Sequence, residues 1–234
     1  MKTSGKFLLG AALSASFSLA QAADLNVRIV NLTNEIWYTP FMVTAHTEDS
    51  RLFRTGEPAS AAIQAMAEGG DIAPLQADLD AIGATSAPNP AGGLLAPGMS
   101  TNIDLNTDGT ANVRLSVVAM LLPTNDAFMG LNGVLIPTEP GTYVYNVPAY
   151  DAGTEANDEL LTGGGAPGAP GMPADPGGLA GTGGSGAAGA DNNTTVHIHR
   201  NTLGDTDATG GTSDLDSRVH RWLNPVARVI VTVR

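Results

Sequence analysis

Residues 113–126 read Val-Arg-Leu-Ser-Val-Val-Ala-Met-Leu-Leu-Pro-Thr-Asn-Asp, a mostly apolar run that ends in a polar loop. Such a run, bounded by a proline-containing turn, predicts a buried β-strand. A second run at residues 142–149 is rich in tyrosine and valine and precedes the loop Asp151-Ala152-Gly153-Thr154-Glu155. Two predicted strands therefore each end in a loop that carries carboxylates.

Short strands are expected along the rest of the chain as well. Residues 25–32 alternate apolar and polar side chains with a period of two, which predicts a half-buried strand. The alanine-rich residues 59–68 and, after Gly69-Gly70, residues 72–82 are expected to form two short helices. Further strands are expected at residues 36–46, 100–105, 111–122, 194–199 and 225–233. Many short strands with one or two short helices indicate an all-β chain folded as an antiparallel β-sandwich.

A strong turn signal separates two of these strands. Asn106-Thr107-Asp108-Gly109 ends in an Asp-Gly pair, which suits the positive φ angles of tight turns. We therefore expect residues 100–105 and 111–122 to pair with each other as a hairpin.

The first residues are typical of a secretory signal peptide. Lys2 and Lys6 precede an apolar run at 7–19, which ends in Ala20-Gln21-Ala22-Ala23. We expect residues 1–23 to be the signal, cleaved after Ala22 or Ala23, and residues 24–234 to be one exported domain. The apolar run is too short to span a bilayer comfortably, so we expect no transmembrane segment in the mature chain and a location in a periplasm or outside the cell.

The charge of the mature chain limits its partners. Loss of Lys2 and Lys6 leaves nine of the 11 basic residues beside all 23 acidic ones, so the formal charge changes from -12 to -14. Simple electrostatics then argues against nucleic acid and anionic membranes as partners and favours cations. Acidity that merely keeps the protein soluble is the alternative. The chain has no cysteine, which excludes disulfides, catalytic thiols and thiolate metal sites.

Residues 162–190 differ in composition from the rest of the chain. They are mostly glycine, alanine and proline, with almost no large apolar side chain. Such a segment buries too little surface to offset its ordering entropy. We expect a disordered, flexible insertion within the single domain.

The two carboxylate loops predict a cation site. If their strands are neighbours, Asp126, Asp151 and Glu155 converge, and Gly153 lets the second loop fold back. Clustered carboxylates without a cation raise one another's pKa, whereas calcium takes hard oxygen ligands. The alternative is that Asp126 caps a turn while Asp151 and Glu155 are solvated.

Several segments together resemble a known family. They are residues 52–59, 123–131, 150–157 and 224–229, of which Asp-Ala-Gly-Thr-Glu at 151–155 is the most specific. With them the chain resembles the spondin N-terminal domain family in its bacterial form, over most of the mature chain except residues 162–190.

The resemblance implies a C2-like β-sandwich without enzymatic activity. It implies calcium bound by an aspartate of the first loop and two acids of the second, here Asp126, Asp151 and Glu155. It also implies an extracellular or periplasmic protein or surface as partner. The chain departs from the animal members by having Glu155 where aspartate is usual, and by lacking cysteines and thrombospondin-type repeats. The longer side chain changes the geometry of the site.

Three other readings stay open. Residues 205–216 match part of the EF-hand calcium-loop pattern, although a solvated acidic loop is the simpler explanation. The stretch that starts at Asp104 matches only the first positions of that pattern, and a turn is the simpler explanation there. His197 and His199 alternate along a predicted strand and, with His46 or His220, form a candidate copper or zinc site of a periplasmic protein. The third hypothesis is a hydrolase whose catalytic triad is assembled from distant residues. The chain has no nucleophile-elbow motif, so the sequence does not place such a triad.

Overall fold

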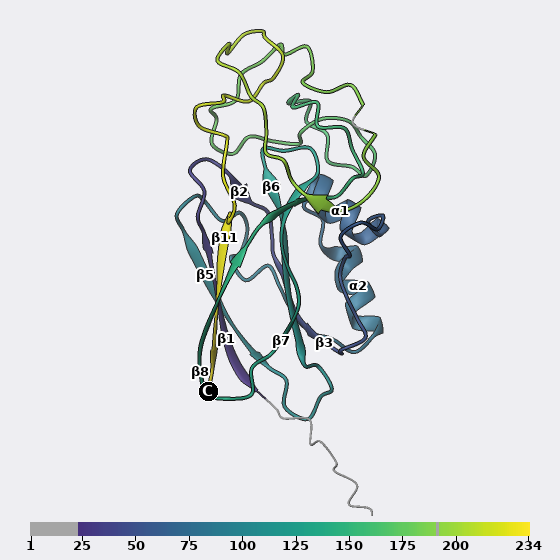
Figure 1. Cartoon of the computed structure of the whole chain (residues 1–234), viewed down its shortest axis with the longest axis vertical. Helices are drawn as coiled ribbons and strands as arrows, with labels where there is room; N and C mark the ends of the chain where they lie inside the picture. The colour runs from purple at the N-terminus through teal and green to yellow at the C-terminus, as the bar shows by residue number, and fades with distance from the viewer. Residues whose placement is uncertain (1–22, 191) are drawn as a thin grey trace, which may run out of the picture.

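A computed structural model of the chain describes residues 23–190 and 192–234. In these residues two antiparallel sheets and two short helices form, so the predicted all-β sandwich is confirmed (Figure 1). The predicted signal peptide, residues 1–23, lies outside the described residues except for Ala23. None of the helices in the described ranges is long and apolar enough to span a membrane.

The first sheet follows the alternation that its sequence predicts. Its strands, in order, are β5 (Ser100–Asn106), β1 (Asp24–Asn31), β11 (Ala227–Val233) and β8 (Gly141–Val147). In β1 the side chains of Leu25, Val27 and Ile29 are fully buried against the other sheet, and the residues between them face outward. Each buried side chain of this kind contributes about 2 kcal/mol to folding.

The second sheet is larger and is buried on both faces. Its strands, in order, are β10 (His197–Ile198), β9 (Ala149–Asp151), β7 (Ala127–Leu135), β6 (Arg114–Leu122), β3 (Met42–His46) and β4 (Thr85–Pro88), and β2 (Trp37–Tyr38) also pairs with β6. In β6, Val117 and Ala119 pack into the core between the sheets, whereas Val118 and Met120 pack on the helix side. The mostly apolar run at 113–122 reflects this burial on both faces.

The helices α1 (Ala61–Gly69) and α2 (Ala73–Ala81) cover the outer face of the second sheet (Figure 1). The Ser60 side chain accepts the Ile63 N–H at 3.2 Å and begins α1, and Gly70 ends it with a φ of 70°. The end at Gly70 agrees with the Gly69-Gly70 signal in the sequence, and Ser60 is a residue type that commonly caps the start of a helix. Both helices lie within a few residues of their predicted bounds.

The hairpin expected around residues 106–109 is wrong. The chain does turn there, with Gly109 at a φ of 69° and the Thr110 N–H bonded to the Thr107 carbonyl. However, β5 pairs with β1 in the first sheet and β6 pairs with β3 and β7 in the second. The turn joins the two sheets, because a local turn signal does not specify the partner of either strand.

Residues 162–190 also differ from the expected disordered insertion. They form no helix and no named strand, but their backbone follows a defined path. Met172 is fully buried, its N–H donates to the Leu160 carbonyl at 2.7 Å, and the Gly181 N–H donates to the Asp214 carbonyl at 2.6 Å. Composition could not reveal this order, because distant residues supply the hydrogen-bond partners.

Residues 152–190 and 192–226 gather at the end of the sandwich opposite the C-terminus (Figure 1). We call them the loop cap. Within the described part of this region the only named strand is β10. The two carboxylate loops lie where the loop cap meets the sheets.

Met172→Ala tests whether residues 162–190 are anchored. We expect the free energy of unfolding, measured in urea, to fall by about 2 kcal/mol because a buried side chain leaves a cavity. Leu179→Ala is the matched control, since Leu179 is 48% exposed in the same segment, and it should change the free energy by less than about 0.5 kcal/mol. Equal, small effects of both variants would show that the segment is not anchored.

Candidate metal site at the end of the sandwich

The two carboxylate loops meet because their strands are neighbours. In the register of β7 and β9, Ala127 lies opposite Asp151, so Asp126 stands beside the end of β9. The Ala152 N–H donates to the Asp126 carbonyl at 3.3 Å and continues the pairing by one residue. The structure thus brings Asp126 and Asp151 together.

Asp126 is fully buried and only half satisfied. Its Oδ2 accepts the N–H of Thr154 at 2.9 Å and of Glu155 at 3.2 Å, whereas its Oδ1 has no hydrogen-bond partner. Burial, and then the charge of Asp151, raise the pKa of Asp126 to about 7. A carboxyl group in this setting favours either a proton or a cation near neutral pH.

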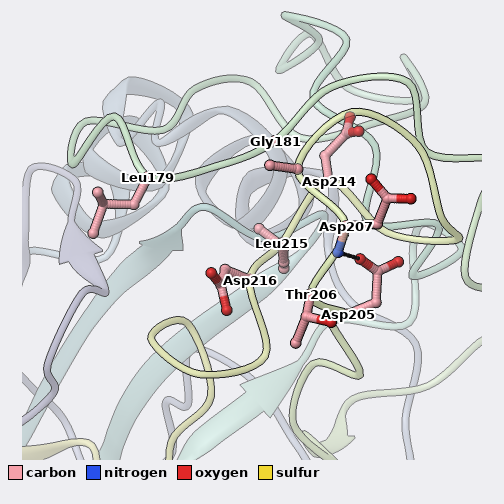
Figure 2. A pocket seen from close by; sticks show the side chains of 9 residues that line it. Leu179, Gly181, Asp205, Thr206, Asp207, Asp214, Leu215 and Asp216 are labelled. Atoms are coloured by element: carbon pink, nitrogen blue, oxygen red, sulfur yellow. Dashed lines mark hydrogen bonds between the residues drawn. The ribbon is translucent and has the colours of Figure 1, made fainter.

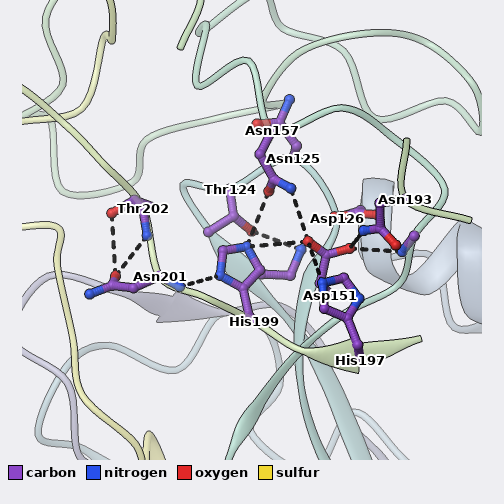
Figure 3. Close-up of polar contacts among 12 residues, drawn as sticks. Thr124, Asn125, Asp126, Asp151, Asn157, Asn193, His197, His199, Asn201 and Thr202 are labelled. Carbon is purple, nitrogen blue, oxygen red and sulfur yellow. Dashed lines mark hydrogen bonds and ion pairs between the residues drawn. The ribbon is translucent and has the colours of Figure 1, made fainter. Parts of the chain in front are cut away.

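Asp151 is also fully buried, but both of its oxygens are engaged (Figure 3). Oδ1 accepts the Gly153 N–H at 2.9 Å and the Asn193 side-chain amide at 2.6 Å, and Oδ2 accepts the Asn157 amide at 2.9 Å. Gly153 has a φ of 71°, and a Cβ there would lie 2.5 Å from the Thr195 nitrogen. Only glycine fits this turn, which explains its place between the two acids.

The Glu155 side chain points toward Gly171, in the glycine-rich part of the loop cap. Oε1 accepts the Asn125 side-chain amide at 2.9 Å and the Gly171 N–H, while Oε2 is buried without a partner. Burial raises the pKa of Glu155 to about 7, and the nearby charges of Glu68 and Asp158 add to the effect. The structure therefore brings the Glu155 backbone, but not its carboxylate, to the Asp126–Asp151 pair.

In this arrangement the three predicted ligands do not close on one point. Within residues 23–190 and 192–234, no group of three or more histidine, aspartate or glutamate side chains is placed to hold a metal ion. The amides of Asn125, Asn157 and Asn193 orient the carboxylates instead. Sequence reasoning missed these asparagines, although Asn125 and Asn157 lie within the segments that carry the family resemblance.

His197 and His199 also lie at this end of the sandwich (Figure 3). The Nε2 atom of each is 3.9 Å from Asp151 Oδ2. The His199 Nδ1 accepts the Asn201 N–H at 2.9 Å, so in the neutral ring Nε2 carries the proton and donates to Asn157 Oδ1 at 3.1 Å. A copper or zinc ligand needs a nitrogen lone pair, and this arrangement uses both nitrogens of His199.

The remaining two histidines belong to other networks. His46 is fully buried, with Nε2 2.8 Å from the Ser116 hydroxyl and Nδ1 3.0 Å from the Thr47 carbonyl. Ser116 is fully buried as well, so solvent does not reach this serine–histidine pair. The His46 Nδ1 lies against a backbone carbonyl, whereas in a catalytic triad the histidine bonds to a carboxylate at that nitrogen. His220 accepts the Asp216 N–H at 3.0 Å in the loop cap. Neither ring is a ligand partner of His197.

The EF-hand-like residues 205–216 surround a cavity of about 20 Å³ (Figure 2). Their carboxylates are engaged within the loop cap itself: Asp205 accepts the N–H of Thr212 at 2.8 Å, and Asp216 pairs with Arg218 at 2.5 Å. Asp214 accepts two backbone N–H groups of the loop cap. These aspartates hold the loop together instead of forming a ligand shell. At the other partial match, Asp104 lies on β5 and bonds Asn26.

Comparison with protein families gives one match. A family model described as Spondin_N matches residues 31–160 of the 234-residue chain. The matched region starts at the last residue of β1, ends within the loop cap, and includes Asp126, Asp151 and Glu155. No curated protein matches the chain.

The raised pKa of Asp126 predicts the pH dependence of stability without metal. Between its ordinary 3.8 and about 7, the folded state binds more protons than the unfolded state, so stability falls as pH rises. In EDTA, we expect wild type to lose roughly 2 kcal/mol more than Asp126→Asn between about pH 5 and pH 7 in urea unfolding. Asp207→Asn, which changes an exposed loop carboxylate, should behave like wild type. Identical pH profiles of all three proteins would contradict the raised pKa of the buried Asp126.

Proposed function

Because the chain belongs to the spondin N-terminal domain family, we propose that it is an exported, non-enzymatic calcium-binding β-sandwich module. The proposed ligands are Asp126 and Glu155, with Asp151 beside them as a ligand or as fixed negative charge. The bound ion orders the two loops and forms part of a surface for an extracellular or periplasmic partner. This role agrees with the acidic composition and with the signal-like residues 1–23.

One observation carries the proposal. Among the described residues, two buried carboxylate oxygens have no hydrogen-bond partner, Asp126 Oδ1 and Glu155 Oε2. Both belong to ligands that the family resemblance implies, and in both residues the pKa is raised to about 7. Unsatisfied buried acceptors are rare and costly in folded proteins. A hard divalent cation with oxygen ligands removes that cost for both groups at once.

The surrounding contacts fit a calcium site of modest affinity. The carboxylates of Asp126 and Asp151 are fixed by backbone N–H groups and side-chain amides, so they are oriented before an ion arrives. Glu155 must rotate to join them, and that rotation reduces the affinity. We therefore expect a dissociation constant on the order of 10⁻⁴ to 10⁻³ M, as in extracellular modules.

Unfolding in EDTA and in calcium tests the proposal. At about 100 times the dissociation constant, calcium should add roughly 2.7 kcal/mol to the free energy of unfolding of the mature protein. Asp126→Asn should abolish most of this gain, because the variant keeps an oxygen that accepts the Thr154 and Glu155 N–H groups but loses the ligand charge.

Two controls separate binding from stability. Asp207→Asn should keep the full calcium response, since Asp207 is an exposed carboxylate of the loop cap. Calorimetric titration of calcium into folded Asp126→Asn, below its melting temperature, should show weak or no binding. Wild-type protein that gains no stability at calcium concentrations well above the expected dissociation constant would refute the calcium site.

A further inference from the structure

Glu155 makes hydrogen bonds at two separate places, one through its backbone and one through its side chain. Its backbone N–H donates to Asp126 Oδ2 at 3.2 Å, which places it at the proposed calcium site. Its side chain reaches away from that site, where Oε1 accepts the Gly171 N–H. A single carboxylate therefore connects the proposed site to the glycine-rich part of the loop cap.

The connected segment, residues 166–172, has further contacts with the rest of the chain: the Thr162 hydroxyl donates to the Pro170 carbonyl at 2.8 Å, and the Gly163 N–H donates to the Met172 carbonyl at 3.2 Å. The Gly168 N–H donates to Glu68 Oε2 at 2.6 Å, and the buried Met172 donates to the Leu160 carbonyl at 2.7 Å. Between these two points the Gly171 N–H depends on Glu155. A Cβ on Gly171 would lie 2.2 Å from the Thr162 hydroxyl, so the segment is closely packed against its neighbour where Glu155 holds it.

We propose that Glu155 is a calcium-operated latch on residues 166–172. Without the ion, its carboxylate holds Gly171; with the ion, the carboxylate turns to the Asp126 side and the Gly171 N–H loses its acceptor. This inference rests on the proposed calcium site and adds how occupation of that site changes the surface.

The local charges favour such a switch. Glu155 lies close to Glu68 and Asp158, and like charges repel it from its position in the latch. Its Oε2 has no hydrogen-bond partner there. A divalent cation beside Asp126 offers both oxygens a stronger interaction.

The length of the side chain matters for the same reason. Aspartate is shorter than glutamate by one methylene group. The additional carbon gives residue 155 the reach to Gly171 while its backbone stays bonded to Asp126. We therefore expect Glu155→Asp to lose the contact with Gly171.

Release of the latch would open a specific part of the surface. A cavity of about 430 Å³ lies beside Glu155, and Thr154, Asp158, Gly168 and Pro170 are among the other residues that line it. The latter two residues belong to the latch segment. Movement of that segment changes the shape of this cavity, so calcium would control access to it.

Hydrogen–deuterium exchange of the folded mature protein tests the latch. In wild type, saturating calcium should speed exchange in peptides that contain Gly171 about tenfold, because a charge-assisted hydrogen bond is lost. Glu155→Asp should exchange fast at Gly171 with or without calcium, because the shorter side chain does not reach Gly171. Asp175→Asn is the matched control, since Asp175 accepts the Ala180 N–H at 2.6 Å in the same glycine-rich region, and it should keep the calcium response at Gly171.

The outcomes separate the two proposals. Calcium binding by calorimetry without any change in exchange at Gly171 would overturn the latch and leave the proposed function standing. Slow exchange at Gly171 in calcium-free Glu155→Asp would also overturn it, because Glu155 would then not be the acceptor that matters. Absence of calcium binding in wild type would remove both proposals.

Discussion

The backbone amides of the loop cap have too few strand partners, and this constraint governs one end of the molecule. Buried N–H groups must find acceptors, and here acidic side chains supply many of them. The acidic residues that accept a loop-cap N–H are Glu68, Asp126, Asp151, Glu155, Asp158, Glu159, Asp175, Asp205, Asp207, Asp214 and Asp216. The strong acidity of the chain is therefore partly structural and not only a solubility feature.

The candidate site is a consequence of the same constraint. Asp126 and Glu155 each use one oxygen to hold loop-cap amides and keep the other oxygen buried without a partner. Asp151, in contrast, uses both oxygens for the fold. Carboxylates that already stabilise loops are well oriented, but they are not all available to an ion at the same time. Which carboxylate oxygens could bind an ion thus depends on which of these hydrogen bonds can break.

Particular elements show how far the sequence could be interpreted. The alternation of apolar and polar residues in β1 and the mostly apolar sequence of β6 predicted strands correctly. Successive side chains of a strand point to opposite faces, so the sequence pattern follows directly from which faces of the sheet are buried. The turn at Asp108-Gly109 was correctly placed but wrongly interpreted as a hairpin, since strand partners are set by the whole sandwich. The glycine-rich segment looked disordered because its stabilising partners, such as Asp214, are far away in the sequence.

The sequence by itself determined the class of fold and the family, and it located the acidic loops at the end of the sandwich. These follow from local patterns and from the Asp-Ala-Gly-Thr-Glu segment at residues 151–155. Only the tertiary structure decided where each carboxylate points. Asp126 is buried with one oxygen that has no hydrogen-bond partner, Asp151 accepts hydrogen bonds from side-chain amides, and Glu155 points toward Gly171. The direction of a side chain depends on hydrogen-bond partners brought together by folding, and these partners have no fixed spacing along the chain.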